Sequence, residues 1–217
     1  MTPGEAEGVG GSRQASSRSA ISPSGRASLI LASGSPQRRA ILGDLGLDFE
    51  VQVSDVAERD AGAPVAVAAE NARRKALAVA GDGVVSELVV GCDTLVATGD
   101  QIWGKPPDEA AARATLRHLS GRTHEVVSGL ALVAGGEVRE ATEITLVTFR
   151  ELDEPAIDWY LTTREWEGRA GGYAIQGRGA VLVSRIEGDY LNVVGLPVAA
   201  LLSLEPHLQR DFAAHAG

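Results

Sequence analysis

The sequence predicts an α/β fold in which a mixed β-sheet is flanked by helices and two lobes leave a cleft between them. Apolar runs of strand length alternate with longer helical patterns, as at 88–96 and 64–80. The strand patterns at 123–133 and 138–150 are joined by a turn at 134–136, which is typical of an antiparallel hairpin. A length of 217 residues with 44% hydrophobic composition is enough to bury a sizeable core.

The first elements are a strand, a polar loop and a helix. A buried strand is predicted at 28–32, and after a short turn Pro36 starts a helix over 36–46 that ends at Gly46. Alternation at 49–54 indicates a second strand. The loop after the first strand therefore lies at the N-terminus of a helix.

The remaining predicted elements are three helices and a strand. Helices are predicted at 108–119 and 154–163, and a glycine-rich stretch at 170–179 leads into an apolar strand at 180–186. A last helix is predicted at 197–204, with proline at its front. Strands interspersed with helices, together with the hairpin, favour a mixed sheet.

The two ends of the chain are expected to lie outside this domain. Residues 1–26 are rich in Gly, Ser, Pro and Arg and offer almost no apolar surface to bury, which predicts a disordered tail. We expect the domain to span 27–209 and residues 210–217 to form a flexible end.

Composition narrows the class of protein. A net charge of -9 argues against a surface built to hold nucleic acid. No apolar run reaches the length of a membrane-spanning helix, and the N-terminus lacks the apolar segment of a secretory signal. The single Cys92 cannot form an internal disulfide, so we expect a cytoplasmic protein without a structural zinc site.

The loop at 33–39 carries groups that suit a phosphate. Ser33 and Ser35 supply hydroxyls, Arg38 supplies a guanidinium, and the start of the helix supplies free backbone N–H groups. The alternative is a serine-capped helix whose arginines lie in solvent.

Asp93 interrupts an apolar strand. An ionised carboxylate is costly there unless it is paired, hydrogen-bonded or bound to metal, although Asp93 could instead cap a turn beside Thr94. Glu58, Lys75 and Lys105 could share its cleft, while each alone is more typical of a solvated charge. As a set, the acids would hold a metal or activate water, and the cations would neutralise a triphosphate.

The glycine-rich stretch would let backbone approach a ligand closely. Its Gln176 can donate and accept hydrogen bonds, as base recognition requires, but a tight connection with Gln176 in solvent fits the pattern better. Tyr173 and Trp166 either stack on a base or belong to the core. His124 is interpreted as a structural hydrogen bonder, and Cys92 as a small buried strand residue.

Several motifs, taken in order, resemble those of the Maf-type nucleotide pyrophosphatases over nearly all of 29–204. Each motif is weak alone, but together they are highly specific. They are Leu31-Ala32-Ser33-Gly34-Ser35-Pro36 with Arg38, Lys75-Ala76, Gly91-Cys92-Asp93-Thr94, Gly104-Lys105-Pro106, Leu119-Ser120-Gly121-Arg122-Thr123-His124, Ala170-Gly171-Gly172-Tyr173 with Ile175-Gln176-Gly177, and Val194-Gly195-Leu196-Pro197. The resemblance implies an elongated fold with a central cleft, similar to the inosine triphosphate pyrophosphatases, and frequent homodimers.

The resemblance also implies hydrolysis of a nucleoside triphosphate between its α and β phosphates, with Mg²⁺ or Mn²⁺ as cofactor. Asp93 matches the family's catalytic acid and serves as proton acceptor for water, as metal ligand or as both. Glu58 matches a second acid near the metal. The positions that match the family's phosphate contacts are Ser33, Ser35, Arg38, Lys75 and Lys105.

Base preference follows less directly from the resemblance. Members that look specific for dTTP and UTP carry Arg where this chain has Gln37, but Thr94 and Gln176 match that subgroup. The subgroup that prefers methylated guanosine triphosphate has an acid in place of Gln176. The chain therefore resembles the pyrimidine group more closely, with Gln37 as a departure.

Three functions compete at this point. The leading hypothesis is a pyrophosphatase that removes unwanted nucleotides. The second is a nucleotide-binding regulator of septum formation and cell division, and the third is an ordinary phosphatase or phosphodiesterase. The presence of two acids favours catalysis, because phosphate binding alone needs only the cations.

Overall fold

The computed structural model describes residues 28–81 and 87–209. Its strands are β1 (Leu29–Leu31), β2 (Phe49–Val51), β3 (Leu88–Thr98), β4 (Gln101–Trp103), β5 (Thr123–Ala134), β6 (Glu137–Phe149) and β7 (Val183–Glu187). Its helices are α1 (Pro36–Asp44), α2 (Pro64–Ala80), α3 (Glu109–Leu119), α4 (Glu154–Thr162), α5 (Tyr190–Val194) and α6 (Val198–Leu204), with short 3₁₀ helices at Ala170–Gly172 and Arg178–Leu182.

The strands form one mixed sheet in the order β2-β1-β3-β5-β6-β7, with β4 paired to β3. Strand β1 is parallel to both of its neighbours, β2 and β3. The pairs β3–β5, β5–β6 and β6–β7 are antiparallel. This confirms the predicted α/β class and the hairpin, whose register pairs Val133 with Val138.

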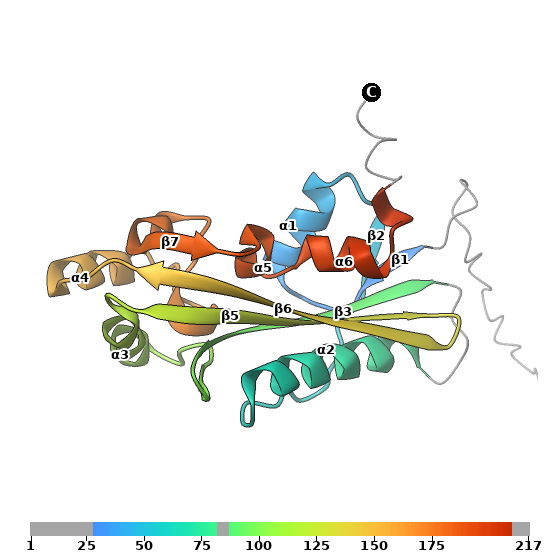
Figure 1. Ribbon diagram of the computed structural model, residues 1–217, viewed down its shortest axis with the longest axis horizontal. Helices are drawn as coiled ribbons and strands as arrows, with labels where there is room; N and C mark the ends of the chain where they lie inside the picture. Colours follow the sequence, from blue (N-terminus) through green and yellow to red (C-terminus); the bar gives the residue numbers. More distant parts are fainter. Residues whose placement is uncertain (1–27, 82–86, 210–217) are drawn as a thin grey trace, which may run out of the picture.

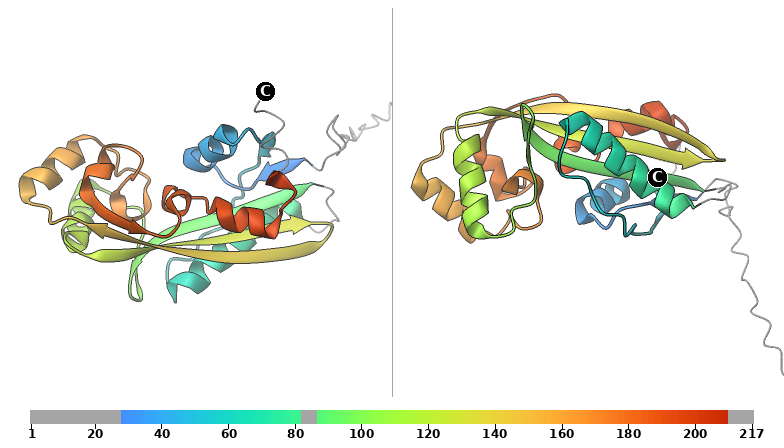
Figure 2. Two further views of the ribbon diagram at one scale, coloured as in Figure 1. Left: turned by 45° about the horizontal axis from the view of Figure 1, so that its top comes forward. Right: turned by 90° about the horizontal axis from the view of Figure 1, so that it is seen from below.

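The molecule is elongated, because β5 and β6 run through both of its lobes (Figure 1). One large apolar core lies among β1, β3, α1 and α6, and a second lies under α3 and α4 near β7. Two smaller clusters lie between α2 and the sheet. Figure 2 shows α2 on one face of the sheet and α6 on the other. The predicted pair of lobes is therefore present, with the long strands joining them.

Helix α2 packs unusually close to the sheet at two glycines. A Cβ atom at Gly91 would lie 2.3 Å from the carbonyl oxygen of Ala72, and one at Gly129 would lie 2.2 Å from that of Ala68. Only glycine permits this approach. It places the side chains of α2 that face β3 directly against the strand that carries Asp93.

Two boundaries and two short elements differ from the sequence prediction. The strand predicted at 180–186 begins only at Val183, because the chain first makes a 3₁₀ turn in which the Gly179 N–H donates to the Glu165 carboxylate (3.2 Å). Strand β2 stops at Val51, short of the predicted 49–54, so the loop bearing Glu58 leaves the sheet edge early. The short elements β4 and α5 were not predicted.

The remaining predictions about the chain have different outcomes. Gly46 follows α1 with a φ of 73°, which confirms it as the stop of that helix. The predicted tails at 1–26 and 210–217 lie outside the described residues. Within the part of the chain that the structure describes, no helix is both long and apolar enough to cross a membrane.

Candidate active site

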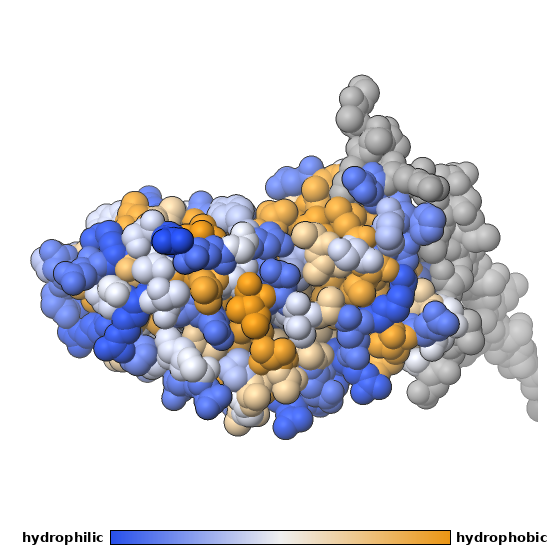
Figure 3. Space-filling model, in the orientation of Figure 1, coloured by the Kyte–Doolittle hydropathy of each residue, from blue (hydrophilic) through white to orange (hydrophobic). Residues whose placement is uncertain are grey.

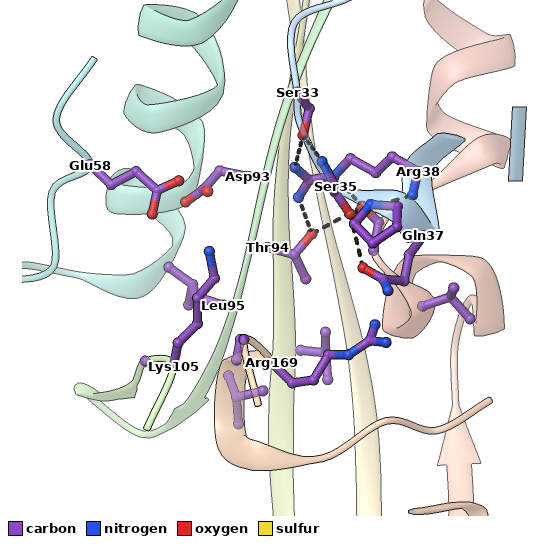
Figure 4. A pocket seen from close by; sticks show the side chains of 18 of the residues that line it. Ser33, Ser35, Gln37, Arg38, Glu58, Asp93, Thr94, Leu95, Lys105 and Arg169 are labelled. Atoms are coloured by element: carbon purple, nitrogen blue, oxygen red, sulfur yellow. Dashed lines mark hydrogen bonds between the residues drawn. The ribbon is translucent and has the colours of Figure 1, made fainter. Parts of the chain in front are cut away.

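A cavity of about 920 Å³ opens between the two lobes, within the size range of small-molecule sites. Its walls come from the loop after β1, helix α2, strand β3, the turn after β4 and the glycine-rich loop (Figure 4). The structure brings every residue singled out for the site to this one cavity: Ser33, Ser35, Gln37, Arg38, Glu58, Lys75, Asp93, Thr94, Lys105 and Gln176.

Arg38 is held inside the protein and does not lie in solvent. It is 7% exposed, and its Nε donates to the carbonyl oxygen of Gly195 at 2.8 Å. Its two terminal nitrogens donate to Ser33 Oγ (2.9 Å) and Thr94 Oγ1 (3.1 Å). A guanidinium has five N–H donors, so two remain for a ligand. The alternative of a solvated arginine at this position is wrong.

Ser35 caps helix α1, as that alternative also proposed. Its hydroxyl oxygen accepts from the backbone N–H of Arg38 at 3.4 Å, and its O–H donates to Gln37 Oε1 at 3.1 Å. Pro36 occupies the first turn, where it has no N–H to satisfy. The cap and the cavity wall are thus the same residues.

Asp93 is buried between two donors from helix α2. Lys75 Nζ donates to Asp93 Oδ1 at 2.6 Å, and Asn71 Nδ2 donates to Asp93 Oδ2 at 2.9 Å. Asp93 and Lys75 are each 8% exposed. Pairing of this kind makes a buried carboxylate tolerable. The alternative that Asp93 caps a turn beside Thr94 is wrong, because both residues lie inside β3.

Glu58 reaches the same ammonium from the loop after β2. Lys75 Nζ lies 2.5 Å from Glu58 Oε1, so one cation bridges both acids. Partial burial raises the pKa of Glu58, but the hydrogen bond and charge of Lys75, with smaller contributions from Lys105 and Arg38, hold it below its ordinary value. Glu58 is therefore an anion at neutral pH.

Asn71 is a site residue that the sequence reasoning missed. It is 2% exposed and lies four residues before Lys75, on the same face of α2. Besides Asp93, its Nδ2 donates to the carbonyl oxygen of Arg59 at 2.9 Å, and its Oδ1 accepts from the Arg59 N–H at 2.8 Å. The spacing to Lys75 was the one signal in the sequence.

The carbonyl oxygen of Gly195 accepts hydrogen bonds from helix α1, which follows the loop after β1, and from strand β3. Besides Arg38, it accepts from Thr94 Oγ1 at 3.2 Å and from the Cys92 thiol at 3.4 Å. Thr94 Oγ1 also lies 2.8 Å from Ser128 Oγ. Cys92 is fully buried, and burial raises its pKa, which confirms the interpretation as a small buried strand residue.

The opposite wall is more open. Figure 4 shows Lys105 pointing toward the two acids, and Arg169, which the sequence reasoning also missed, extending toward the side of Gln37. Lys105 and Gln176 are exposed and Arg169 is partly buried. Within residues 28–81 and 87–209, the side chains of these three make no hydrogen bond. Their donors remain available to a ligand.

The aromatic residues near this wall belong to the core. Tyr173 and Trp166 are 6% and 8% exposed, and Tyr173 also lines the cavity. His124 Nε2 lies 2.9 Å from the Tyr173 hydroxyl oxygen, and its ring meets those of Tyr173 and Phe149 edge to face. Burial lowers the pKa of His124 to about 4. The structural interpretation of His124 is confirmed.

The acids suit a divalent cation only in part. Among the described residues, no group of three or more His, Cys, Asp and Glu side chains gathers to hold a metal. Glu58 and Asp93 nevertheless converge on one point, where Lys75 now sits. Mg²⁺ is commonly bound by one or two carboxylates together with substrate phosphates and water. The donor set fits a metal that arrives with a phosphorylated ligand.

The family comparison and the relatives found by sequence agree with each other. Residues 28–205 match the family described as "Maf-like protein". A dTTP/UTP pyrophosphatase of Pyrococcus furiosus is 45% identical over 181 residues, which cover 81% of this chain and 93% of that protein. One of Deinococcus radiodurans is 44% identical over 177 residues, 81% of this chain and 90% of that protein. The structure of the Staphylococcus aureus Ham1 protein can be superposed on this one with a TM-score of 0.40 and 14% identity. The superposition covers 56% of this chain and 71% of the Ham1 chain.

Proposed function

Because the chain belongs to the Maf family, we propose that it hydrolyses a nucleoside triphosphate to the monophosphate and pyrophosphate, with dTTP and UTP as preferred substrates. The observation that carries this proposal is the buried Asp93 carboxylate, fixed by two donors in a cavity that also holds free cationic donors. Removal of unwanted nucleotides would be the physiological result.

The residues supply positioning and charge. Arg38 and Lys105 would neutralise phosphate oxygens with the donors that the protein does not use. Asp93 would accept the proton of a water molecule whose oxygen attacks the α-phosphorus. The bond from that phosphorus to the bridging oxygen then breaks, and pyrophosphate leaves with its electron pair. No covalent intermediate with the protein is required.

We propose that Glu58 and Asp93 hold Mg²⁺ or Mn²⁺ together with phosphate oxygens of the substrate. When bound, the ion would withdraw charge from the phosphates. Lys75, which bridges the two acids, would then turn toward a phosphate oxygen. Its position between the acids supports a role as their counter-charge when no substrate is bound.

For the base, we propose that Gln176 reads the pyrimidine edge, with Gln37 and Thr94 shaping the same end of the cavity. Gln176 is exposed and both donates and accepts, which suits the mixed donor and acceptor pattern of thymine and uracil. The names of the relatives support a pyrimidine. Gln37 remains the departure from the dTTP and UTP subgroup that the sequence showed.

We also propose a cytoplasmic homodimer that acts on free nucleotides and not on nucleic acid. The lone, buried Cys92 fits a reducing compartment. Figure 3 shows apolar residues gathered over the middle of one face and around α6. Ile144 of β6 and Tyr190 of α5 are large apolar side chains that are 43% and 44% exposed. Sedimentation velocity should give a dimer for the wild type and a monomer for Ile144→Glu.

The test of the activity is a panel of nucleoside triphosphates assayed for pyrophosphate with Mg²⁺ or Mn²⁺ and with EDTA. We expect turnover of dTTP and UTP that EDTA abolishes. Release of inorganic phosphate would indicate a phosphatase instead. Tight nucleotide binding with no turnover across the panel would contradict the proposal and favour a regulator.

A further inference from the structure

We propose that Asn71 is a positioning residue that joins Asp93 to the loop bearing Glu58 and so sets the relative placement of the two acids. The inference deepens the proposed function and rests on it. Asn71 is the sole described side chain that contacts both Asp93 and the backbone next to Glu58.

The first half of this connection is to Asp93. Before a substrate binds, Lys75 occupies one carboxylate oxygen and Asn71 the other, so the plane of the carboxylate is fixed by two bonds from the same helix face. A single bond from Lys75 would leave the group free to rotate about its last torsion, which has a broad minimum. With Asn71 present, the oxygens point in defined directions.

The second half is to the loop. The Asn71 amide makes a paired contact with the N–H and C=O of Arg59, in the manner of one more strand residue. Residues 52–60 form no helix or strand, and Glu58 itself is 47% exposed at its side chain. The bond from Lys75 to Glu58 and the Asn71 contacts thus fix this segment from adjacent positions.

Chemistry explains why an amide is needed. The residue at position 71 must donate to the Asp93 carboxylate, donate to the Arg59 carbonyl and accept from the Arg59 N–H, all without adding a charge. Asparagine supplies these from one planar group, whereas Asp lacks the donors and Leu or Ala lack all three. Because Asn71 and Asp93 are both buried, loss of the bond between them would leave a carboxylate oxygen without that donor.

The experiment compares Asn71→Ala and Asn71→Asp with the wild type and with Leu161→Ala. Leu161 is 2% exposed, belongs to the buried face of α4 and does not line the cavity, so its variant reports a loss of stability alone. Asn71→Ala should lower kcat by roughly 10- to 100-fold while KM changes by less than about threefold, because a partner of a site carboxylate is lost and the phosphate cations remain. Leu161→Ala should keep kcat within about twofold when assayed below its unfolding midpoint.

Asn71→Asp keeps only the acceptor for the Arg59 N–H. It loses the donors to Asp93 and to the Arg59 carbonyl and adds a charge beside Asp93, so kcat should fall at least as far as in Asn71→Ala. In an Asp93→Asn background, Asn71→Ala should cost no further activity, because residues that act as a unit are not additive. A kcat within twofold of the wild type, or an equal loss in both backgrounds, would overturn the inference.

A readout without turnover keeps the inference apart from the proposed function. Trypsin cleavage after Arg59, followed by mass spectrometry, should rise by about tenfold in Asn71→Ala, because the backbone there loses two bonds. Cleavage after Arg178, an exposed residue of the 3₁₀ helix before β7 that does not line the cavity, serves as the internal reference. If the wild type turns over no nucleotide, the proposed function fails, while unchanged cleavage after Arg59 would overturn the role of Asn71.

Discussion

The two walls of the cavity are built differently. The acid wall, made of Ser33, Arg38, Asn71, Lys75 and Asp93, is buried, and each of its side chains bonds to at least one other group in the protein. The loop wall, made of Arg169 and Gln176, is more exposed. Groups that the protein holds in a fixed orientation stabilise a transition state best, because charge develops there at defined positions. Donors without a partner in the protein suit recognition of the part of the ligand that differs between substrates. The comparison implies that the acid wall governs rate and the loop wall governs choice of substrate.

The largest effect should follow from removal of the acid at the centre of the acid wall. Asp93→Asn keeps the shape of the side chain but removes its charge and its ability to accept a proton. We expect kcat to fall by about 10³-fold or more with KM little changed. Pyrophosphate release measures this, with circular dichroism as the control for folding. Retention of a tenth of the activity would mean that another group accepts the proton.

Two arginine variants, one from each wall, test the difference between the walls. Arg38→Lys cannot reach Ser33, Thr94 and Gly195 with one ammonium, so kcat/KM should fall by roughly 100-fold and the melting temperature should fall as well. Arg169→Ala removes a side chain with no hydrogen bond among the described residues. It should raise KM by about tenfold and leave the melting temperature unchanged.

The opposite pattern, with Arg169→Ala losing stability and Arg38→Lys losing none, would break the comparison. Thermal unfolding without nucleotide separates the outcomes, because a bound ligand would stabilise the folded state by itself.

The acid wall was also the part that the sequence predicted best. Short motifs carry Ser33, Arg38 and Asp93, and burial of a charge in an apolar strand is visible without coordinates. That Asn71 contacts Arg59 depends on how α2 lies on the sheet, which follows from the close approach at Gly91. Arg38 is buried through its bonds to Ser33, Thr94 and Gly195, two of which lie far from it in the sequence. Such contacts join distant segments and leave no local pattern.

On the loop wall the sequence was less informative for a physical reason. An apolar run such as 180–186 suits a strand or a turn against a core equally well. The choice was made by the tight contact at Gly179, where a Cβ atom would lie 2.4 Å from the carbonyl oxygen of Ala174. Arg169 had no signal, because an arginine beside glycines is common on surfaces.

Gln37 and Gln176 should give a smaller effect that sharpens the comparison. Gln37→Arg restores the side chain of the dTTP and UTP subgroup and should raise kcat/KM for dTTP by about three- to tenfold, as one added charged donor would. Gln176→Glu should shift the ratio of kcat/KM between UTP and GTP by a similar factor and leave kcat for the better substrate nearly unchanged. Competition assays with mixed nucleotides measure both ratios. A fall in kcat as large as that of Asp93→Asn would mean that the loop wall takes part in the reaction itself.

The smallest effect on activity should come from His124, which supports the loop wall from behind through Tyr173. Its pKa is about 4 in the folded protein, against 6.5 for the free group. Above pH 6.5 the ring is neutral in both states and pH has no influence through it. As the pH falls from 6.5 to 4, the unfolded chain binds a proton that the folded one does not, so stability is lost. The His124→Gln variant has no imidazole at this position, so it does not lose stability in this way.

The gap in unfolding free energy between wild type and His124→Gln should therefore narrow by about 1–3 kcal/mol between pH 7 and pH 4. Urea titrations across this range measure it, with the exposed His207→Gln as the matched control that follows the wild-type curve. A constant gap would show that the buried ring is protonated in the folded state. In that case a water or a shift of Tyr173 must solvate His124, and the loop wall would rest on a less rigid support than its burial implies.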